Sequence, residues 1–131
     1  MAAIRLLLDT HTLLWWLFDD PKLSAAARCA IVDPHNEVLV SAASAWEIAT
    51  KHRLGRLPEA GDVPLRLTHY LRRARFTALH ISLEHAMAAG ALPGPQKDPF
   101  DRMLVAQARI EDLAVATVDR VFRDYGVAVI W

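Results

Sequence analysis

Five carboxylate residues form the pattern in this sequence that could do chemistry. Each stands where a short apolar run ends or in the first turns of a helical pattern, and they are Asp9, Glu47, Asp98, Asp101 and Asp119. If the apolar runs are parallel strands, these residues meet near the carboxyl edge of one sheet, where open α/β folds place their sites. A cluster of like charges needs a cation to hold it together. The pattern therefore predicts divalent-metal chemistry on a phosphodiester.

Short apolar runs and helical patterns alternate along the chain. Strands are expected at 4–8, 38–40, 78–81, 113–117 and 127–130, all of the buried type. Helices are expected at about 11–18, 24–32, 43–54, 62–75, 83–90, 99–111 and 120–124. This alternation predicts an α/β fold with parallel strands and crossover helices.

Length and composition predict one globular domain spanning residues 1–131. Apolar residues make up 53% of the 131 residues and charged residues 23%. The single cysteine, Cys29, can form no internal disulfide, so a reducing, cytoplasmic setting is expected. Charged residues such as Arg5 and Asp9 interrupt the apolar N-terminus, and no apolar stretch reaches the ~20 residues of a membrane-spanning helix.

The net charge of zero conceals an uneven distribution along the chain. Residues 51–80 hold seven Lys or Arg against two acidic residues, a net charge of +5, and the rest of the chain carries −5. The basic segment is either a solvated helix face or a track for the phosphates of RNA. The candidate RNA contacts are Lys51, Arg53, Arg66, Arg72 and Arg73.

Each carboxylate also has a structural explanation. Asp9, Asp98 and Asp119 stand where an Asp could cap a helix start, and Pro99 suits the first helical position. Asp101, three residues after Asp98, completes an acidic first turn.

Glu47 could pair with Lys51 four residues later on one helix. Its other neighbours at helical spacing carry no charge, so a cation is the alternative partner. The joint pattern favours the metal site, because unrelated structural acids have no reason to converge on one edge.

Other residues leave alternatives open. The helix expected at 11–18 carries Trp15, Trp16 and Phe18, which predict either simple burial or a surface for an oligomer or a partner protein. The six histidines show no pairing that supports a metal-free acid–base nuclease, and His11 is expected to pack near Asp9 rather than titrate in catalysis.

Four motifs resemble those of PIN-domain ribonucleases, specifically VapC-type toxins of type II toxin–antitoxin systems. They lie at residues 7–15, 41–48, 98–102 and 116–119, in the order expected for that family. The resemblance implies a three-layer α/β/α fold with a central parallel sheet of four or five strands. It also implies a Mg²⁺ or Mn²⁺ site, endonucleolytic RNA cleavage, a homodimer and a cognate antitoxin protein.

By motif match, Asp9, Glu47, Asp101 and Asp119 correspond to the family's acidic residues, and Asp98 is a further acid typical of this subgroup. Which of Asp98 and Asp101 ligates the metal directly stays open. One or two cations would lower the pKa of a bound water and orient it in line with the phosphorus, so no protein nucleophile is required. The resemblance adds 5′-phosphate and 3′-hydroxyl products.

Two other functions are compatible with parts of the pattern. One is a catalytically silent binding module that keeps the fold. The other is a receiver-like, Mg-dependent phosphoacceptor domain. The second is disfavoured because Asp9 has no acidic neighbour and no lysine follows Lys97.

Overall fold

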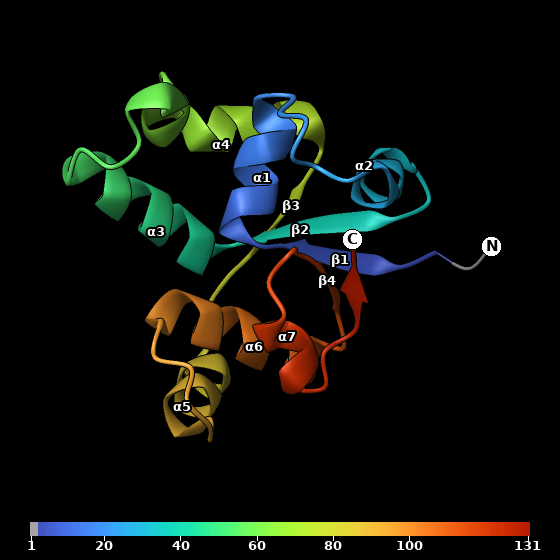
Figure 1. Cartoon of the computed structure of the whole chain (residues 1–131), viewed down its shortest axis with the longest axis vertical. Coiled ribbons are helices and arrows are strands. Elements are labelled where there is room, and N and C mark those ends of the chain that lie inside the picture. Colours follow the sequence, from blue (N-terminus) through green and yellow to red (C-terminus); the bar gives the residue numbers. More distant parts are fainter. Residues whose placement is uncertain (1–2) are drawn as a thin grey trace.

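Five parallel strands form one sheet in the order β3-β2-β1-β4-β5 (Figure 1). This computed structural model describes residues 3–131. The strands are β1 (Arg5–Leu8), β2 (Glu37–Ser41), β3 (Thr77–Leu79), β4 (Ala114–Ala116) and β5 (Val129–Ile130). The predicted parallel sheet of four or five strands is confirmed.

Seven α-helices and one 3₁₀ turn connect the strands in the part of the chain that the structure describes. The helices are α1 (Thr10–Leu17), α2 (Ala25–Val32), α3 (Ala42–Arg53), α4 (Val63–Ala74), α5 (Leu83–Ala91), α6 (Pro99–Glu111) and α7 (Val121–Asp124), and the 3₁₀ turn is η1 (Pro58–Ala60). Each predicted helix is present with ends within one residue of the expected ones. No helix among residues 3–131 is both long and apolar enough to cross a membrane.

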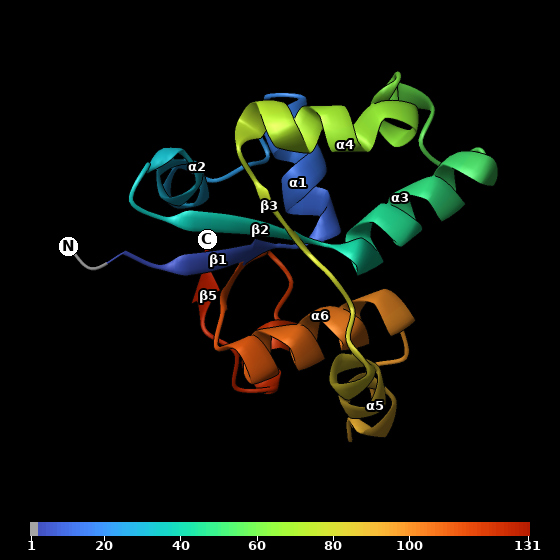
Figure 2. The ribbon, with the colours of Figure 1, turned by 180° about the vertical axis from the view of Figure 1, so that it is seen from behind.

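The two faces of the sheet are covered by different helices, as Figures 1 and 2 show. Side chains alternate across a strand, so Leu6 and Leu8 of β1 belong to one buried cluster and Leu7 to another. The first cluster packs under α1, α2 and α4, and the second under α6 and α7, while α5 packs on α6. The three-layer α/β/α architecture is therefore confirmed.

The chain reverses its direction across the sheet between β1 and β4. From β1 it moves outward to β2 and β3, and then it returns to the other side of β1 with β4 and β5. Such a switch point opens a crevice at the carboxyl ends of the strands. The order also differs from the 2-1-3-4-5 order of receiver-type sheets, which removes the structural basis for that alternative.

The strand β3 differs from its prediction. It was expected to be a buried strand over 78–81, but it covers Thr77–Leu79 at the edge of the sheet, and Thr77 and Ala78 are exposed. An edge strand has a neighbour on one side only, so short apolar residues there do not imply burial.

Candidate active site

One pocket of about 320 Å³ collects all five predicted carboxylates. It is lined by Asp9, Thr10, His11, Glu47, Lys51, Asp98, Asp101, Val118 and Asp119. Asp9 directly follows β1, and Val118 and Asp119 come just after β4, so the pocket lies at the switch point of the sheet. In Figure 1, α1 and α3 start from neighbouring strand ends, and α6 begins below them. The predicted convergence of the acids on one edge is present in the structure.

Asp9 caps α1 and also faces the pocket. Its Oδ1 accepts a hydrogen bond from the Thr12 amide at 2.9 Å, and its Oδ2 accepts from the Thr117 hydroxyl at 2.6 Å. The Thr12 hydroxyl donates to the Ala116 carbonyl at 2.8 Å. These bonds join the start of α1 to the end of β4 and fix the buried Asp9 side chain, which is 6% exposed.

Glu47 reaches the pocket from the second turn of α3 and is 5% exposed. Its Oε1 accepts from the Thr10 hydroxyl at 2.6 Å, and its Oε2 lies 2.6 Å from Lys51 Nζ. The ion pair with Lys51, one of the two partners considered for Glu47, is therefore present. Among residues 3–131, Lys51 is the only lysine or arginine that lines the pocket, so the carboxylates outnumber it.

Asp98 and Asp101 stand at the start of α6. Asp98 is the N-cap, and its Oδ1 accepts from the amides of Phe100 at 2.8 Å and Asp101 at 3.3 Å. Pro99 occupies the first turn, as the sequence predicts. The Gln96 side chain donates to Asp101 Oδ2 at 3.5 Å. Asp98 therefore serves the helix and the pocket together.

Asp119 approaches the pocket from the segment after β4. Its amide donates to the Thr117 hydroxyl at 2.9 Å, and its Oδ1 accepts from the Val121 amide at 3.0 Å. The predicted capping role is present in part, because Val121 is the first residue of α7 although the N-cap position belongs to Arg120. Asp119 is the exposed member of the carboxylate group.

Burial, as the largest cause, together with the negative charges of the other carboxylates raises the pKa of Asp101 to about 7. In order of decreasing effect these are Asp98, Asp119, Glu47 and Asp9. A carboxyl group that holds its proton near neutral pH marks a place where negative charge is in excess.

The donor set of this pocket fits a hard divalent cation, because it consists of carboxylate oxygens. Within residues 3–131, however, no three Asp, Glu, His or Cys side chains are grouped closely enough to hold an ion as they stand. Two of the carboxylates already have partners of their own: Lys51 pairs with Glu47, and an amide of α6 donates to Asp98. The pocket therefore brings the carboxylates together, but their side chains are not yet arranged to ligate one ion.

The predicted RNA contacts do not all lie at the pocket. Lys51 lines the pocket, whereas Arg53 at the end of α3 and the three arginines of α4, Arg66, Arg72 and Arg73, are exposed and do not. A groove of about 700 Å³ shares His11 and Lys51 with the pocket. Its other charged residues are Asp20, Lys22, Arg56 and Glu59.

The two tryptophans of α1 pack against other aromatic side chains of the molecule, and Phe18 follows the helix as its C-cap. Trp15 packs near Trp131 and Trp16 near Phe76, with ring centroids 5.7 and 6.3 Å apart. Phe18 is 39% exposed and lines the groove. Both tryptophans are partly buried by these contacts, and a surface for an oligomer or a partner protein stays a prediction for this helix.

Sequence reasoning missed the polar residues that hold the carboxylates. Thr10 positions Glu47, Thr117 positions Asp9, and Gln96 contacts Asp101. The hydroxyl residues had a usable signal, since each closely follows the end of a strand at the edge where the acids meet. Gln96 lies in a loop and had no such signal.

Comparisons with known proteins agree with this architecture. The family profile of the PIN domain matches residues 6–128. Ribonuclease VapC22 of Mycobacterium tuberculosis is 32% identical over 120 residues, which cover 91% of this chain and 90% of the relative. Ribonuclease VapC16 of the same organism is 40% identical over 73 residues, which cover 53% of this chain and only 50% of that relative.

Solved structures share the fold at low sequence identity. VapBC2 from Rickettsia felis, bound to a promoter DNA fragment, has a TM-score of 0.71 at 14% identity and covers 96% of this chain and 97% of that chain. A toxin–antitoxin complex from Klebsiella pneumoniae has a TM-score of 0.58 at 21% identity, covering 87% and 86%. Together with the profile match, the full-length similarity to VapC22 shows that this chain belongs to the PIN-domain family, among the VapC ribonucleases.

Proposed function

We propose that the protein is a metal-dependent endoribonuclease and the toxin of a toxin–antitoxin pair. The observation that carries the proposal is the pocket at the switch point of the sheet, where five carboxylates meet one lysine. The VapC relatives are named ribonucleases, which supports RNA as the substrate.

The residues proposed to hold Mg²⁺ or Mn²⁺ are Asp9, Glu47, Asp98, Asp101 and Asp119, which are also the proposed catalytic residues. When bound, such a cation supplies Lewis acidity toward the phosphoryl oxygens and activates water. The chain itself orients the carboxylates: Thr117 fixes Asp9, and Thr10 fixes Glu47. No serine, cysteine or histidine nucleophile is needed for this hydrolysis.

Lys51 is the proposed RNA contact nearest to the chemistry, because it lines both the pocket and the neighbouring groove. Arg53, Arg66, Arg72 and Arg73 are proposed as outer contacts that act through the salt-dependent attraction of phosphates. Substitutions of these four arginines should weaken RNA binding and reduce its salt dependence without changing the cleavage step.

The proposed protein partner is a cognate antitoxin, and the Klebsiella pneumoniae toxin–antitoxin complex of the same fold supports this assignment. We also propose a homodimer and a cytoplasmic location, as the family resemblance implies. Leu83 and Met87, one turn apart on α5, are 85% and 76% exposed and offer an apolar contact surface. Size-exclusion chromatography with light scattering tests the dimer, which Leu83→Glu with Met87→Glu should weaken if α5 lies in the interface.

Cleavage of purified RNA classes in the presence of Mg²⁺, of Mn²⁺ or of a chelator tests the activity. We expect cleavage with either cation, arrest by the chelator, and products with 5′-phosphate and 3′-hydroxyl ends. Cleavage that continues in chelator, or cyclic phosphate ends, would contradict the metal mechanism. Binding of RNA without cleavage under every condition would instead support the catalytically silent binding module.

A further inference from the structure

Arg102 follows Asp101 directly, yet it pairs with no carboxylate in the described part of the chain. Its guanidinium instead donates to four backbone carbonyl groups. These are the carbonyls of Ala89 at 3.0 Å, Gly90 at 3.3 Å, Leu92 at 2.6 Å and Gln96 at 2.8 Å. Arg102 lies beside the acidic pocket but binds only main-chain oxygens, so its role is to hold the backbone in place.

The carbonyls that Arg102 binds belong to the end of α5 and to the loop that leads into α6. The last carbonyls of a helix lack partners within the helix, and α5 ends without a glycine cap. A cation at this end also complements the helix dipole. Arg102 therefore closes α5 and ties the loop 92–98 to the first turn of α6.

The middle of this loop is fixed by close packing as well. Gly94 has a φ of +98°, and a Cβ at this position would lie 2.8 Å from Tyr125 Oη. The loop is therefore held at three points, by Tyr125 near its middle and by Arg102 at Leu92 and Gln96.

Gln96 connects the loop to the acidic pocket. Its carbonyl accepts from Arg102, its side-chain Oε1 accepts from the Asp98 amide at 3.1 Å, and its Nε2 donates to Asp101 Oδ2 at 3.5 Å. A displacement of the Gln96 backbone would thus change the surroundings of both carboxylate residues.

We propose that Arg102 is a positioning residue that acts through Gln96 to hold Asp98 and Asp101 in the arrangement required for cation binding. The inference rests on the proposed metal-dependent function. It assigns to Arg102 a role in the site although its side chain bonds none of the carboxylates.

Calorimetric titration with Mn²⁺ tests this role without relying on activity. Arg102→Ala should weaken Mn²⁺ binding by roughly tenfold or more, in the range found when supporting residues of metal sites are removed. The Mn²⁺ affinity of Arg102→Lys should lie between those of the wild type and Arg102→Ala, because an ammonium group reaches fewer carbonyls than the planar guanidinium fork. Arg109→Ala is the matched control, since Arg109 is an exposed arginine in the last turn of the same helix, and it should bind Mn²⁺ like the wild type.

A double-mutant cycle separates positioning from general support of the fold. If Arg102 acts through Gln96, the effects of Arg102→Ala and Gln96→Ala on Mn²⁺ affinity should be far from additive. Amide hydrogen exchange in residues 92–98 should also accelerate in Arg102→Ala.

Four outcomes would count against the inference. Unchanged Mn²⁺ affinity in folded Arg102→Ala, with only a lower melting temperature, would leave Arg102 a purely structural role, and additive effects would remove Gln96 as the intermediary. If Arg102→Ala does not fold, equal affinities for Arg102→Lys, Gln96→Ala and the wild type would overturn it. Absence of Mn²⁺ binding by the wild type would instead overturn the proposed function and this inference with it.

Discussion

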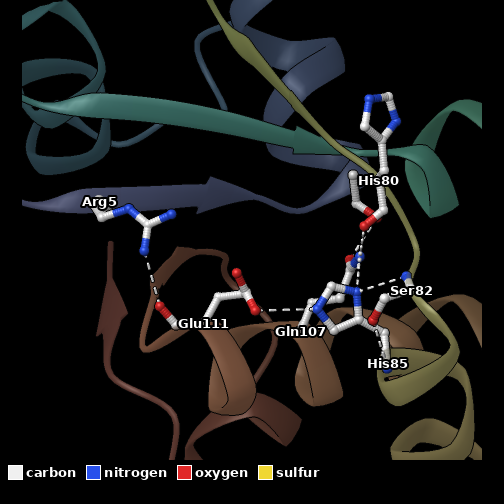
Figure 3. Close-up of polar contacts among 7 residues, drawn as sticks. Arg5, His80, Ser82, His85, Gln107 and Glu111 are labelled. Carbon is white, nitrogen blue, oxygen red and sulfur yellow. Dashed lines mark hydrogen bonds and ion pairs between the residues drawn. The ribbon is translucent and has the colours of Figure 1, made fainter.

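Two groups of polar side chains lie close to α6, and they differ in how well the charges and hydrogen-bonding atoms of their members match one another. The first is the acidic pocket, where five carboxylates share one lysine. The second, which we name the His85 cluster, consists of His85, Gln107 and Glu111 (Figure 3), together with Ser41, which bonds Gln107.

The His85 cluster matches donors with acceptors. Ser41 donates to Gln107 Oε1 at 2.6 Å, and Gln107 Nε2 donates to the His80 carbonyl at 3.3 Å. His85 Nδ1 accepts from the Ser82 amide at 3.1 Å, and its Nε2 lies 3.3 Å from Glu111 Oε2. A buried histidine beside a glutamate is here a structural pair, whereas five carboxylates around one lysine leave an excess of negative charge, which indicates a site for a cation.

The largest expected effect is the loss of activity in Asp9→Asn. Asparagine caps helices as well as aspartate does, so the free energy of unfolding should change little. Loss of the negative charge should lower the RNA cleavage rate by roughly 100-fold or more. Asp124→Asn, at an exposed carboxylate outside the pocket, is the control and should cleave normally. Full activity of Asp9→Asn in a preparation free of other nucleases would refute the assignment.

Gln107→Leu should lower the stability of the fold and leave cation binding unchanged, the opposite of what we expect for Asp9→Asn. Gln107 is fully buried, and its loss leaves the Ser41 hydroxyl without its acceptor. We expect a loss of about 1–3 kcal/mol in the free energy of unfolding, measured with urea, and an unchanged Mn²⁺ affinity. Weaker Mn²⁺ binding at unchanged stability would show that the distinction between the two groups is wrong.

Asp101 should give the metal-free protein a distinctive pH dependence. Its pKa is raised from 3.8 to about 7, so between these values the folded state keeps a proton that the unfolded chain has released. Its contribution to stability is therefore complete below about pH 4 and is lost as the pH rises to about 7. Asp101→Asn removes this dependence.

Urea denaturation in chelator, at about pH 5 and about pH 8, measures this effect. The stability of Asp101→Asn relative to the wild type should be greater at the higher pH. An equal difference at both values would mean that Asp101 is not the titrating group. In the wild type, cation binding near neutral pH should release protons, which calorimetry in buffers of different ionisation enthalpy detects.

Lys51→Met should produce the smallest effect of these substitutions, a modest change in Mn²⁺ affinity. Lys51 is the positive charge now paired with Glu47, so its removal should favour a competing cation. We expect Mn²⁺ binding to tighten by roughly two- to fivefold, the effect of a partly exposed ion pair. Weaker Mn²⁺ binding would mean that Lys51 supports the carboxylate arrangement instead of opposing the cation.

The sequence was sufficient for features that depend on local chemistry. Asp9 and Asp98 cap their helices as predicted, and the alternation of Leu6, Leu7 and Leu8 divides β1 between two cores. Parallel strands place their carboxyl ends at one edge of the sheet, which is why the meeting of the carboxylates at that edge could be predicted.

Features that depend on the meeting of distant segments were not predictable in the same way. Arg102 binds carbonyls of a different helix and its following loop, and no periodicity in the sequence shows this. The basic residues share one stretch of sequence, but α3 points Lys51 into the pocket and leaves Arg53 outside. The exposure of β3 follows from its edge position, which a run of apolar residues does not reveal.

The double use of Asp9 and Asp98 has a consequence for comparing this protein with related sequences. Both residues hold helix starts, so selection for folding alone would retain them in a protein that had lost its activity. Glu47 and Asp101 cap no helix, and burial makes a charge at either position costly, although Lys51 offsets part of that cost at Glu47. The pair that most clearly separates an active descendant from an inactive one is therefore Glu47 with Asp101.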